Sequence, residues 1–172
     1  MKLEYVDCNL CGSNNYSIVY PAISKKVSIK PFKSSSVELS KDQIVKCKQC
    51  GLIYVNPRLK QKYITKGYSE ASNERFISQT KGREITFEKS MMLIEKYIKT
   101  KGKLLDVGTA GGSFLAVAKR HGWQVNGIEP NKWLCKWCKK HYGITIKQGT
   151  LEKNLFEKNS FDLVTLWDVL EH

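Results

Sequence analysis

The segment Asp106-Val107-Gly108-Thr109-Ala110-Gly111-Gly112 joins an acidic residue to a turn of very small residues. The apolar run at 103–107 predicts a buried strand before this turn, and the apolar spacing at 113–121 predicts a helix after it. Small residues at a strand-to-helix turn let the backbone approach a ligand closely, and the start of the helix offers free N–H groups. We therefore expect a small-molecule cofactor to bind here, with a turn that is only structural as the alternative.

Two cofactor classes fit a turn of this kind. A dinucleotide site requires Gly-x-Gly-x-x-Gly, and that frame reads Gly108-x-Ala110-x-x-Ser113, so two of its three glycines are absent. The frame acid-x-Gly-x-Gly-x-Gly reads Asp106-x-Gly108-x-Ala110-x-Gly112, with one Gly-to-Ala change. This second frame resembles motif I of the class I S-adenosylmethionine-dependent methyltransferases. The two missing glycines of the dinucleotide frame disfavour the alternative of an NAD-dependent enzyme.

The resemblance continues along residues 100–172. Glu129 ends the next predicted strand (123–128), about 20 residues after the turn, where a carboxylate can accept both ribose hydroxyls. The segment Gly149-Thr150-Leu151-Glu152 follows the third predicted strand (144–147), at the place where the family contacts the adenine. The run at 161–172 resembles the family's fourth strand and the loop after it.

The resemblance implies S-adenosylmethionine as cofactor and assigns a set of residues to it. The turn and its acid would bind the methionine part, Glu129 the ribose, and Thr150 and Leu151 the surroundings of the adenine. The implied cofactor-binding residues are Asp106, Gly108, Thr109, Ala110, Gly112, Glu129, Thr150, Leu151 and Asp168. His172 is the candidate general base, and Asp168-x-x-Glu171-His172 as a Mg²⁺ site is a less favoured alternative.

Two pairs of cysteines form a second candidate site. Cys8-x-x-Cys11 and Cys47-x-x-Cys50 are each followed by glycine, and four such thiolates can surround one tetrahedral Zn²⁺. Free structural thiols are the alternative. The segment 50–58 also resembles the zinc-binding N-terminal segment of small-molecule methyltransferases, including relatives of sugar C-methyltransferases. The pair Cys135 and Cys138 lies within a predicted helix (131–142), where we interpret both as packing or surface positions.

The elements that carry these residues predict an α/β fold. We expect a zinc-ribbon-like β module (1–58) with short strands near 16–20, 27–29 and 43–45, then a helical connector (59–100). The apolar spacing is helical from about 72 to 100, and Gly82 could divide that stretch into two helices. Strands and helices alternate after residue 100, which predicts a partial Rossmann-like, doubly wound parallel sheet over 101–172. The family's sheet has seven strands, so we expect the chain to carry the cofactor-binding half of that domain.

Composition limits the partners. No apolar run is long enough to cross a bilayer and the N-terminus lacks the apolar core of a signal peptide, so we expect a cytoplasmic protein. The leading hypothesis is a methyltransferase for a small-molecule acceptor. The net charge of +13 leaves an RNA methyltransferase as a less favoured alternative, and a non-catalytic binding module as another. An exposed sheet edge could promote oligomers.

Overall fold

The computed structural model describes residues 2–23, 42–70, 74–151 and 156–170 of the 172-residue chain. Their contacts form two compact units, which meet along the chain between Gly67 and Tyr68. The candidate base His172 and the strand expected at 27–29 lie outside the described residues. None of the described helices is long and apolar enough to span a bilayer.

The first unit is built from short antiparallel strands. Its described strands are β1 (Leu3–Glu4), β2 (Tyr16–Tyr20), β3 (Ile44–Cys47), β4 (Ile53–Val55) and β5 (Arg58–Leu59). Strand β1 pairs with β5, while β2, β3 and β4 form a three-stranded sheet in that order. These strands confirm the β module expected near the cysteines. Helix α1 (Gln61–Ser69) then leads from the first unit into the second.

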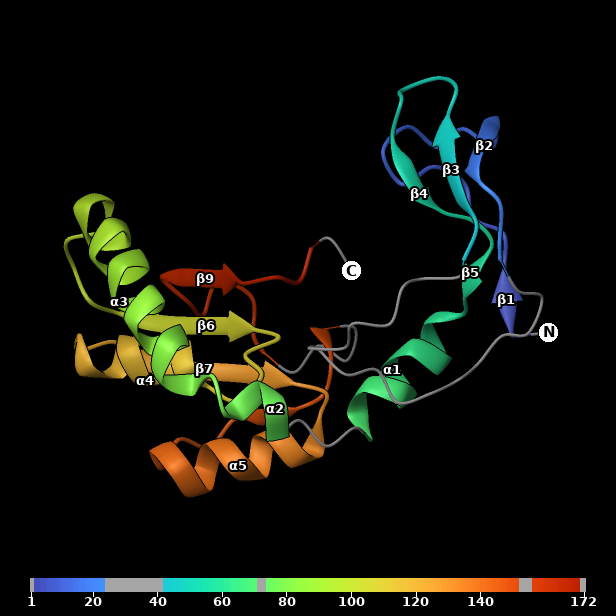
Figure 1. Cartoon of the computed structure of the whole chain (residues 1–172). Coiled ribbons are helices and arrows are strands. Elements are labelled where there is room, and N and C mark those ends of the chain that lie inside the picture. The colour runs from blue at the N-terminus through green and yellow to red at the C-terminus, as the bar shows by residue number, and fades with distance from the viewer. Residues whose placement is uncertain (1, 24–41, 71–73, 152–155, 171–172) are drawn as a thin grey trace. The chain divides into compact units, whose positions relative to one another are not determined.

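The second unit alternates strands and helices. Its elements are α2 (Glu74–Ile77), α3 (Thr80–Tyr97), β6 (Lys103–Val107), α4 (Ser113–Arg120), β7 (Gln124–Glu129), α5 (Lys132–Tyr142), β8 (Lys147–Gln148) and β9 (Leu163–Leu166). All four strands are parallel, in the spatial order β8-β7-β6-β9. This order confirms the expected partial doubly wound sheet, with the first strand of the alternation, β6, at its centre (Figure 1).

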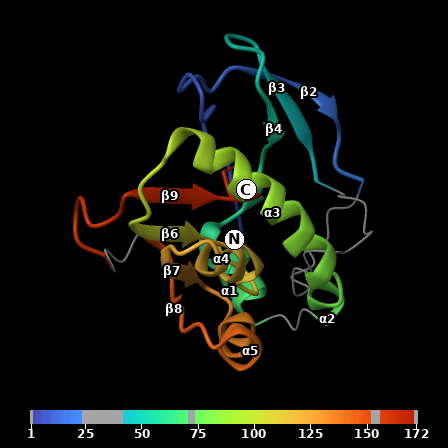
Figure 2. The same ribbon diagram turned by 90° about the vertical axis from the view of Figure 1, so that its left-hand side faces the viewer.

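Helices α3, α4 and α5 cover one face of this sheet (Figure 2). Leu104 of β6 points into the core beneath them, together with Phe114 and Leu115 of α4. The next residue along β6, Leu105, belongs to a smaller cluster on the second face, because successive side chains of a strand alternate in direction. Phe87 of α3 contacts Phe114 with ring centroids 5.3 Å apart, which fixes α3 against α4.

Charged side chains also hold α3 on α4. Arg120 at the end of α4 reaches Glu84 (Nη1 to Oε2, 3.0 Å) and Glu88 (Nη2 to Oε1, 2.7 Å). The ring of His121 lies between Glu88 and Glu95, with its two nitrogens 2.7 and 3.1 Å from their carboxylate oxygens. Hydrogen bonds from Arg120 and His121 lower the pKa of Glu88. This network joins helices that are separated by a strand in the sequence.

Two expected boundaries differ from the structure. The helical stretch over 72–100 is interrupted at Ser78 and Gln79, where the Thr80 hydroxyl donates to the Ile77 carbonyl, so the prediction that Gly82 divides it was wrong. The third strand was expected at 144–147, but β8 spans only Lys147–Gln148. Ile144 and Ile146 instead enter the core before the strand pairing begins, which explains the later start.

Candidate functional site

The small-residue turn lies between β6 and α4. The N–H groups of Gly108 and Thr109 both donate to the carbonyl of Ile128 in the neighbouring strand, at 2.9 and 3.2 Å. Gly108, Ala110 and Gly112 have φ values of +69°, +48° and +79°, a region that L side chains rarely occupy. The backbone therefore turns sharply through alternate residues, as the motif frame predicts.

The glycines of this turn meet different constraints. A Cβ on Gly112 would collide with Sγ of Cys138 in α5, so this glycine allows α4 and α5 to pack closely. A Cβ on Gly108 would lie 2.7 Å from Cγ2 of Val169, in the loop after β9. Ala110 occupies the same φ region with a side chain, which costs about 1–2 kcal/mol. The single departure from the motif is thus accommodated with strain.

Glu129 lies at the carboxyl end of β7, directly beside the turn. Its Oε2 accepts the Ala110 N–H at 2.9 Å and its Oε1 accepts the Asn131 N–H at 2.7 Å. The side chain is fully buried. Burial raises the pKa of Glu129 to about 7, while the hydrogen bonds from Asn131, Ala110 and Tyr68 act in the opposite direction. The structure therefore places the predicted ribose acid next to the turn.

Asp106 lies on β6 and faces the helix side of the sheet. Its Oδ1 accepts a 2.8 Å hydrogen bond from the Thr165 hydroxyl of β9. The Thr109 hydroxyl also lowers the pKa of Asp106, although this hydroxyl has no hydrogen-bond partner among the described residues. Burial outweighs both and raises this pKa to about 7. Asp106 is thus a buried structural neighbour of the turn, with 2% of its surface exposed.

Tyr68 is a neighbour of this site that sequence reasoning missed. Its hydroxyl faces Glu129, and burial together with that carboxylate raises the pKa of Tyr68. The Tyr68 carbonyl accepts a 2.6 Å hydrogen bond from the side-chain amide of Asn131, whose Oδ1 in turn caps α5 by accepting the Leu134 N–H. No local pattern marks Tyr68, because its partners lie about 60 residues further along the chain.

The remaining predicted cofactor residues lie near the same edge of the sheet. Thr150 and Leu151 follow β8, where the Gly149 N–H donates to the Glu129 carbonyl at 3.1 Å. Asp168 is exposed in the loop after β9 and has a φ of +52°. The structure thus gathers the glycine turn, Glu129 and the loops after β8 and β9 at the carboxyl ends of parallel strands, where open α/β sheets bind ligands.

The four N-terminal cysteines converge in the first unit. Sγ of Cys8 is 3.4 Å from Sγ of Cys50, Sγ of Cys11 is 3.6 Å from Sγ of Cys47, and all four lie within 4.8 Å of one another. Tetrahedral Zn²⁺ with bonds of about 2.3 Å separates its sulfur ligands by about 3.8 Å. The cluster therefore has the size and donor set that such an ion requires.

Each cysteine pair forms the same tight turn. The N–H of Gly12 donates to the Cys8 carbonyl at 2.8 Å, and that of Gly51 donates to the Cys47 carbonyl at 3.0 Å. Backbone N–H groups, chiefly that of Cys50, lower the pKa of the Cys47 thiol to about 6. Both knuckles thus direct their sulfurs to one point, and at Cys47 the backbone favours the thiolate that binds metal.

The second cysteine pair has a packing role. Cys138 is fully buried in the core beneath α5, and Sγ of Cys135 points to the Glu129 carbonyl at 3.4 Å. Burial raises the pKa of both thiols, to about 11 for Cys135 and about 12 for Cys138. Neutral buried thiols of this kind are poor nucleophiles and poor metal ligands. The structure agrees with the interpretation of this pair as packing positions.

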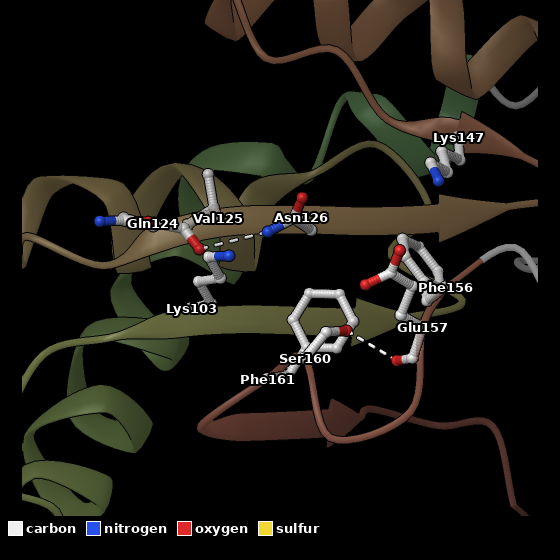
Figure 3. Close-up of a pocket in the computed structure, with 9 residues that line it drawn as sticks. All are labelled: Lys103, Gln124, Val125, Asn126, Lys147, Phe156, Glu157, Ser160 and Phe161. Atoms are coloured by element: carbon white, nitrogen blue, oxygen red, sulfur yellow. Dashed lines mark hydrogen bonds between the residues drawn. The ribbon is translucent and has the colours of Figure 1, made fainter.

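A separate pocket of about 570 Å³ lies on the second face of the sheet (Figure 3). Phe156 and Phe161 contact each other in its wall with ring centroids 5.2 Å apart, and Nζ of Lys147 lies 4.5 Å from the Phe156 ring. The pocket is lined by Lys103, Gln124, Val125, Asn126, Lys147, Phe156, Glu157, Ser160 and Phe161. None of these is a predicted site residue, so the pocket is distinct from the turn and Glu129.

Comparison with known proteins agrees with this geometry. The model of the methyltransferase domain family matches residues 81–172, just over half of the chain. No curated protein sequence matches the chain. The matched residues include β6 in the interior of the sheet, the glycine turn after it and the acid at the end of β7.

Two solved structures illustrate the likeness. A protein from Methanococcus maripaludis, described as an S-adenosylmethionine-dependent methyltransferase, has a TM-score of 0.51 at 16% identity, over 64% of this chain and 53% of its own. CalS10 from Micromonospora echinaspora, an amino pentose methyltransferase, has a TM-score of 0.44 at 19% identity, over 58% and 44%. The chain thus spans about half the length of each. By its family match and its sheet, the chain belongs to the S-adenosylmethionine-dependent methyltransferases of the class I fold.

Proposed function

We propose that this chain binds S-adenosylmethionine at the carboxyl edge of its parallel sheet and serves methyl transfer to a small-molecule acceptor. The observation that carries the proposal is the pairing of the glycine turn with Glu129, joined by the Ala110 N–H at 2.9 Å. A backbone turn that a ligand can approach closely, with a carboxylate at the end of the adjacent strand, suits a nucleoside with two ribose hydroxyls.

Glu129 retains capacity for the ribose. Each of its oxygens accepts one backbone N–H, from Ala110 and from Asn131, and a carboxylate oxygen can accept a second hydrogen bond. The Tyr68 hydroxyl also faces this buried carboxylate, so a ribose bound here would compete with Tyr68 for the remaining hydrogen bonds of Glu129.

The cofactor supplies an electrophilic methyl group on a sulfonium ion. The protein's task is to hold an acceptor atom in line with that methyl group and to keep water away. Asp106 and Glu129 contribute negative charge beside the turn when they ionise, and this favours a positively charged ligand. His172 is the proposed base that removes a proton from the acceptor.

The cysteine cluster is proposed as a structural zinc site. Its four sulfurs come from two knuckles and leave no open position for a substrate or a water ligand, as is typical of structural sites. The described strands of the first unit are short, and few apolar side chains among its described residues are fully buried. Zinc binding would supply folding free energy that this small core does not provide.

An RNA acceptor is a second candidate, because of one feature of α5. Lys132, Lys136 and Lys139 recur at helical spacing and line a groove of about 260 Å³ next to β8. A lysine stripe of this kind can neutralise backbone phosphates, and such binding weakens steeply as salt increases. Fluorescence anisotropy with a labelled RNA at 50 and 200 mM salt tests it. An RNA acceptor would be favoured if the affinity for RNA falls about 10-fold or more between 50 and 200 mM salt, and if this salt dependence is absent in K132Q/K136Q.

Isothermal titration with S-adenosylhomocysteine tests the proposed cofactor site. We expect binding by the chain, and a weakening of at least about 10-fold in Glu129→Ala, because two charge-assisted hydrogen bonds to the ribose are lost. Glu157→Ala is the matched control, since Glu157 is exposed and lines the separate pocket on the second sheet face. Equal affinity in Glu129→Ala and Glu157→Ala would refute the assignment of Glu129.

A further inference from the structure

Helix α3 carries apolar side chains on two sides. On its inner side, Phe87, Met91 and Ile94 pack into the core beneath the helices. On the opposite side, the side chain of Ile85 is 62% exposed and that of Met92 is 54% exposed. A surface helix of a globular protein normally has one apolar side and one polar side. Packing within the second unit therefore does not account for the second apolar side of α3.

Lysines alternate with these exposed apolar side chains. Spacings of four, four, three and four residues separate Lys81, Ile85, Lys89, Met92 and Lys96. Residues three or four apart are neighbours on a helix surface, so these five side chains form one line along α3. All five are exposed.

Two further apolar side chains widen this line. Leu93 and Tyr97 are one helical turn apart, and their side chains are 54% and 82% exposed. Each directly follows a residue of the line, so they lie beside it. We call the line and these two residues the outer face of α3. A patch of exposed apolar side chains with polar groups around it is typical of an interaction surface.

The charges of α3 are divided between its sides. Glu84 and Glu88 contact Arg120 of α4, and Glu95 contacts His121. All three acids of the helix are thus turned to basic partners within the unit. In contrast, none of the three lysines of the outer face forms an ion pair with a described residue. The outer face therefore combines apolar side chains with positive charge alone.

This combination favours one kind of partner. A second copy of the chain, packed on the same face about a two-fold axis, would bring lysines against lysines, and like charges repel. A protein groove that takes up an amphipathic helix encloses it from several sides, but Phe87 and Arg120 fix α3 against α4.

A bilayer surface requires access from one side only. Apolar side chains of a helix can enter the boundary between headgroups and acyl chains, and lysine side chains around them can reach anionic headgroups. We propose that the outer face of α3 binds the surface of an anionic membrane. The contact is peripheral, with the helix lying along the surface, and agrees with the cytoplasmic location expected from the sequence. It does not depend on the proposed cofactor site.

Co-sedimentation with lipid vesicles tests this surface. We expect the chain to bind vesicles of phosphatidylcholine with about one quarter phosphatidylglycerol at least about 10-fold more tightly than vesicles of phosphatidylcholine alone. I85S/M92S should weaken binding to the anionic vesicles by about 10-fold, because it removes apolar side chains that enter the boundary. K89Q/K96Q should weaken it by about 10-fold or more, because it removes two charges at the headgroups.

The matched control is K119Q/K158Q, which removes two exposed lysines outside α3. It should change the affinity for anionic vesicles by less than about threefold, because these lysines lie outside the proposed contact. An equal loss in K119Q/K158Q and K89Q/K96Q would overturn the proposal, since the net charge of the chain would then explain the binding. Thermal unfolding checks that each variant folds, and L93Q/Y97Q carries the same comparison if I85S/M92S does not fold.

Two other results would also overturn the proposal. Unchanged binding by I85S/M92S would show that the apolar side chains of the outer face do not enter the membrane. Absence of binding to anionic vesicles would exclude the membrane as the partner. In that case, a dimer in light scattering that I85S/M92S dissociates would assign the outer face to a second copy of the chain.

Discussion

The backbone N–H of Ala110 donates a 2.9 Å hydrogen bond to Oε2 of Glu129, and this bond joins the glycine turn to the end of the adjacent strand. The parallel register that pairs Val107 with Ile128 brings the two segments together. The same carboxylate thus shapes the turn and faces the proposed ribose position. Changes to Glu129 should therefore affect both the conformation of the turn and the binding of the nucleoside.

Buried acids should make the second unit less stable as the pH rises. The pKa of Asp106 is raised to about 7 by burial, against about 3.9 for an unfolded chain. Because the folded state holds the proton more tightly, the contribution of Asp106 to the free energy of unfolding is full below about pH 4. It is lost progressively as the pH rises to about 7, by up to about 1.4 kcal/mol per pH unit.

Urea unfolding at pH 5, 6 and 7 measures this slope. Asp106→Asn should make the free energy of unfolding depend less on pH, since asparagine does not titrate. Glu129→Gln should remove a similar part of the pH dependence, because the pKa of Glu129 is also raised to about 7. Glu88 and Glu95 have lowered pKa values, so their contribution is lost only as the pH falls through those values. An identical slope in Asp106→Asn and the unmodified chain would contradict the prediction.

Gly112 should be more sensitive to alanine than a glycine with the same backbone and free space. Alanine at Gly112 combines a φ of +79° with a collision against Sγ of Cys138, and we expect a loss of about 2–4 kcal/mol in the free energy of unfolding. Gly143 has a φ of +65° but nothing within 4 Å of an added Cβ, so Gly143→Ala should cost about 1–2 kcal/mol.

Chemical denaturation of both glycine variants gives the comparison. A double-mutant cycle that combines Gly112→Ala with Cys138→Ala should show a coupling energy of about 1 kcal/mol or more, because the smaller side chain relieves the collision. Equal losses at Gly112 and Gly143 would show that backbone strain alone explains the effect.

The cysteine cluster should bind one zinc ion per chain. Elemental analysis after dialysis should find zinc in the unmodified chain and in Cys135→Ser, but little in Cys47→Ser. The reason is that Cys47 belongs to the four-sulfur cluster and Cys135 does not. A strong chelator should increase proteolysis within the first unit, since the metal supplies part of its folding free energy. Retention of zinc by Cys47→Ser would place the metal elsewhere.

Several elements could be predicted from the sequence because their determinants are local. Asn131 and Gly143 mark the ends of α5 through capping chemistry that involves only neighbouring residues. The two Cys-x-x-Cys-Gly segments likewise carry their turn geometry in five consecutive residues. Apolar runs identified β6, β7 and β9, and their alternation with helices predicted the parallel sheet.

Other features depend on contacts between distant parts of the chain, and only the tertiary structure decided them. The late start of β8 follows from the burial of Ile144 and Ile146 beneath α5. The position of Tyr68 at Glu129 carries no periodicity or motif that would indicate it. The sequence by itself thus determined the local elements, the metal-ligand spacing and the motif frame, since these arise from neighbouring residues. Packing decided which side chains meet at the carboxyl edge of the sheet, because burial and hydrogen bonding there join segments about 20 to 60 residues apart.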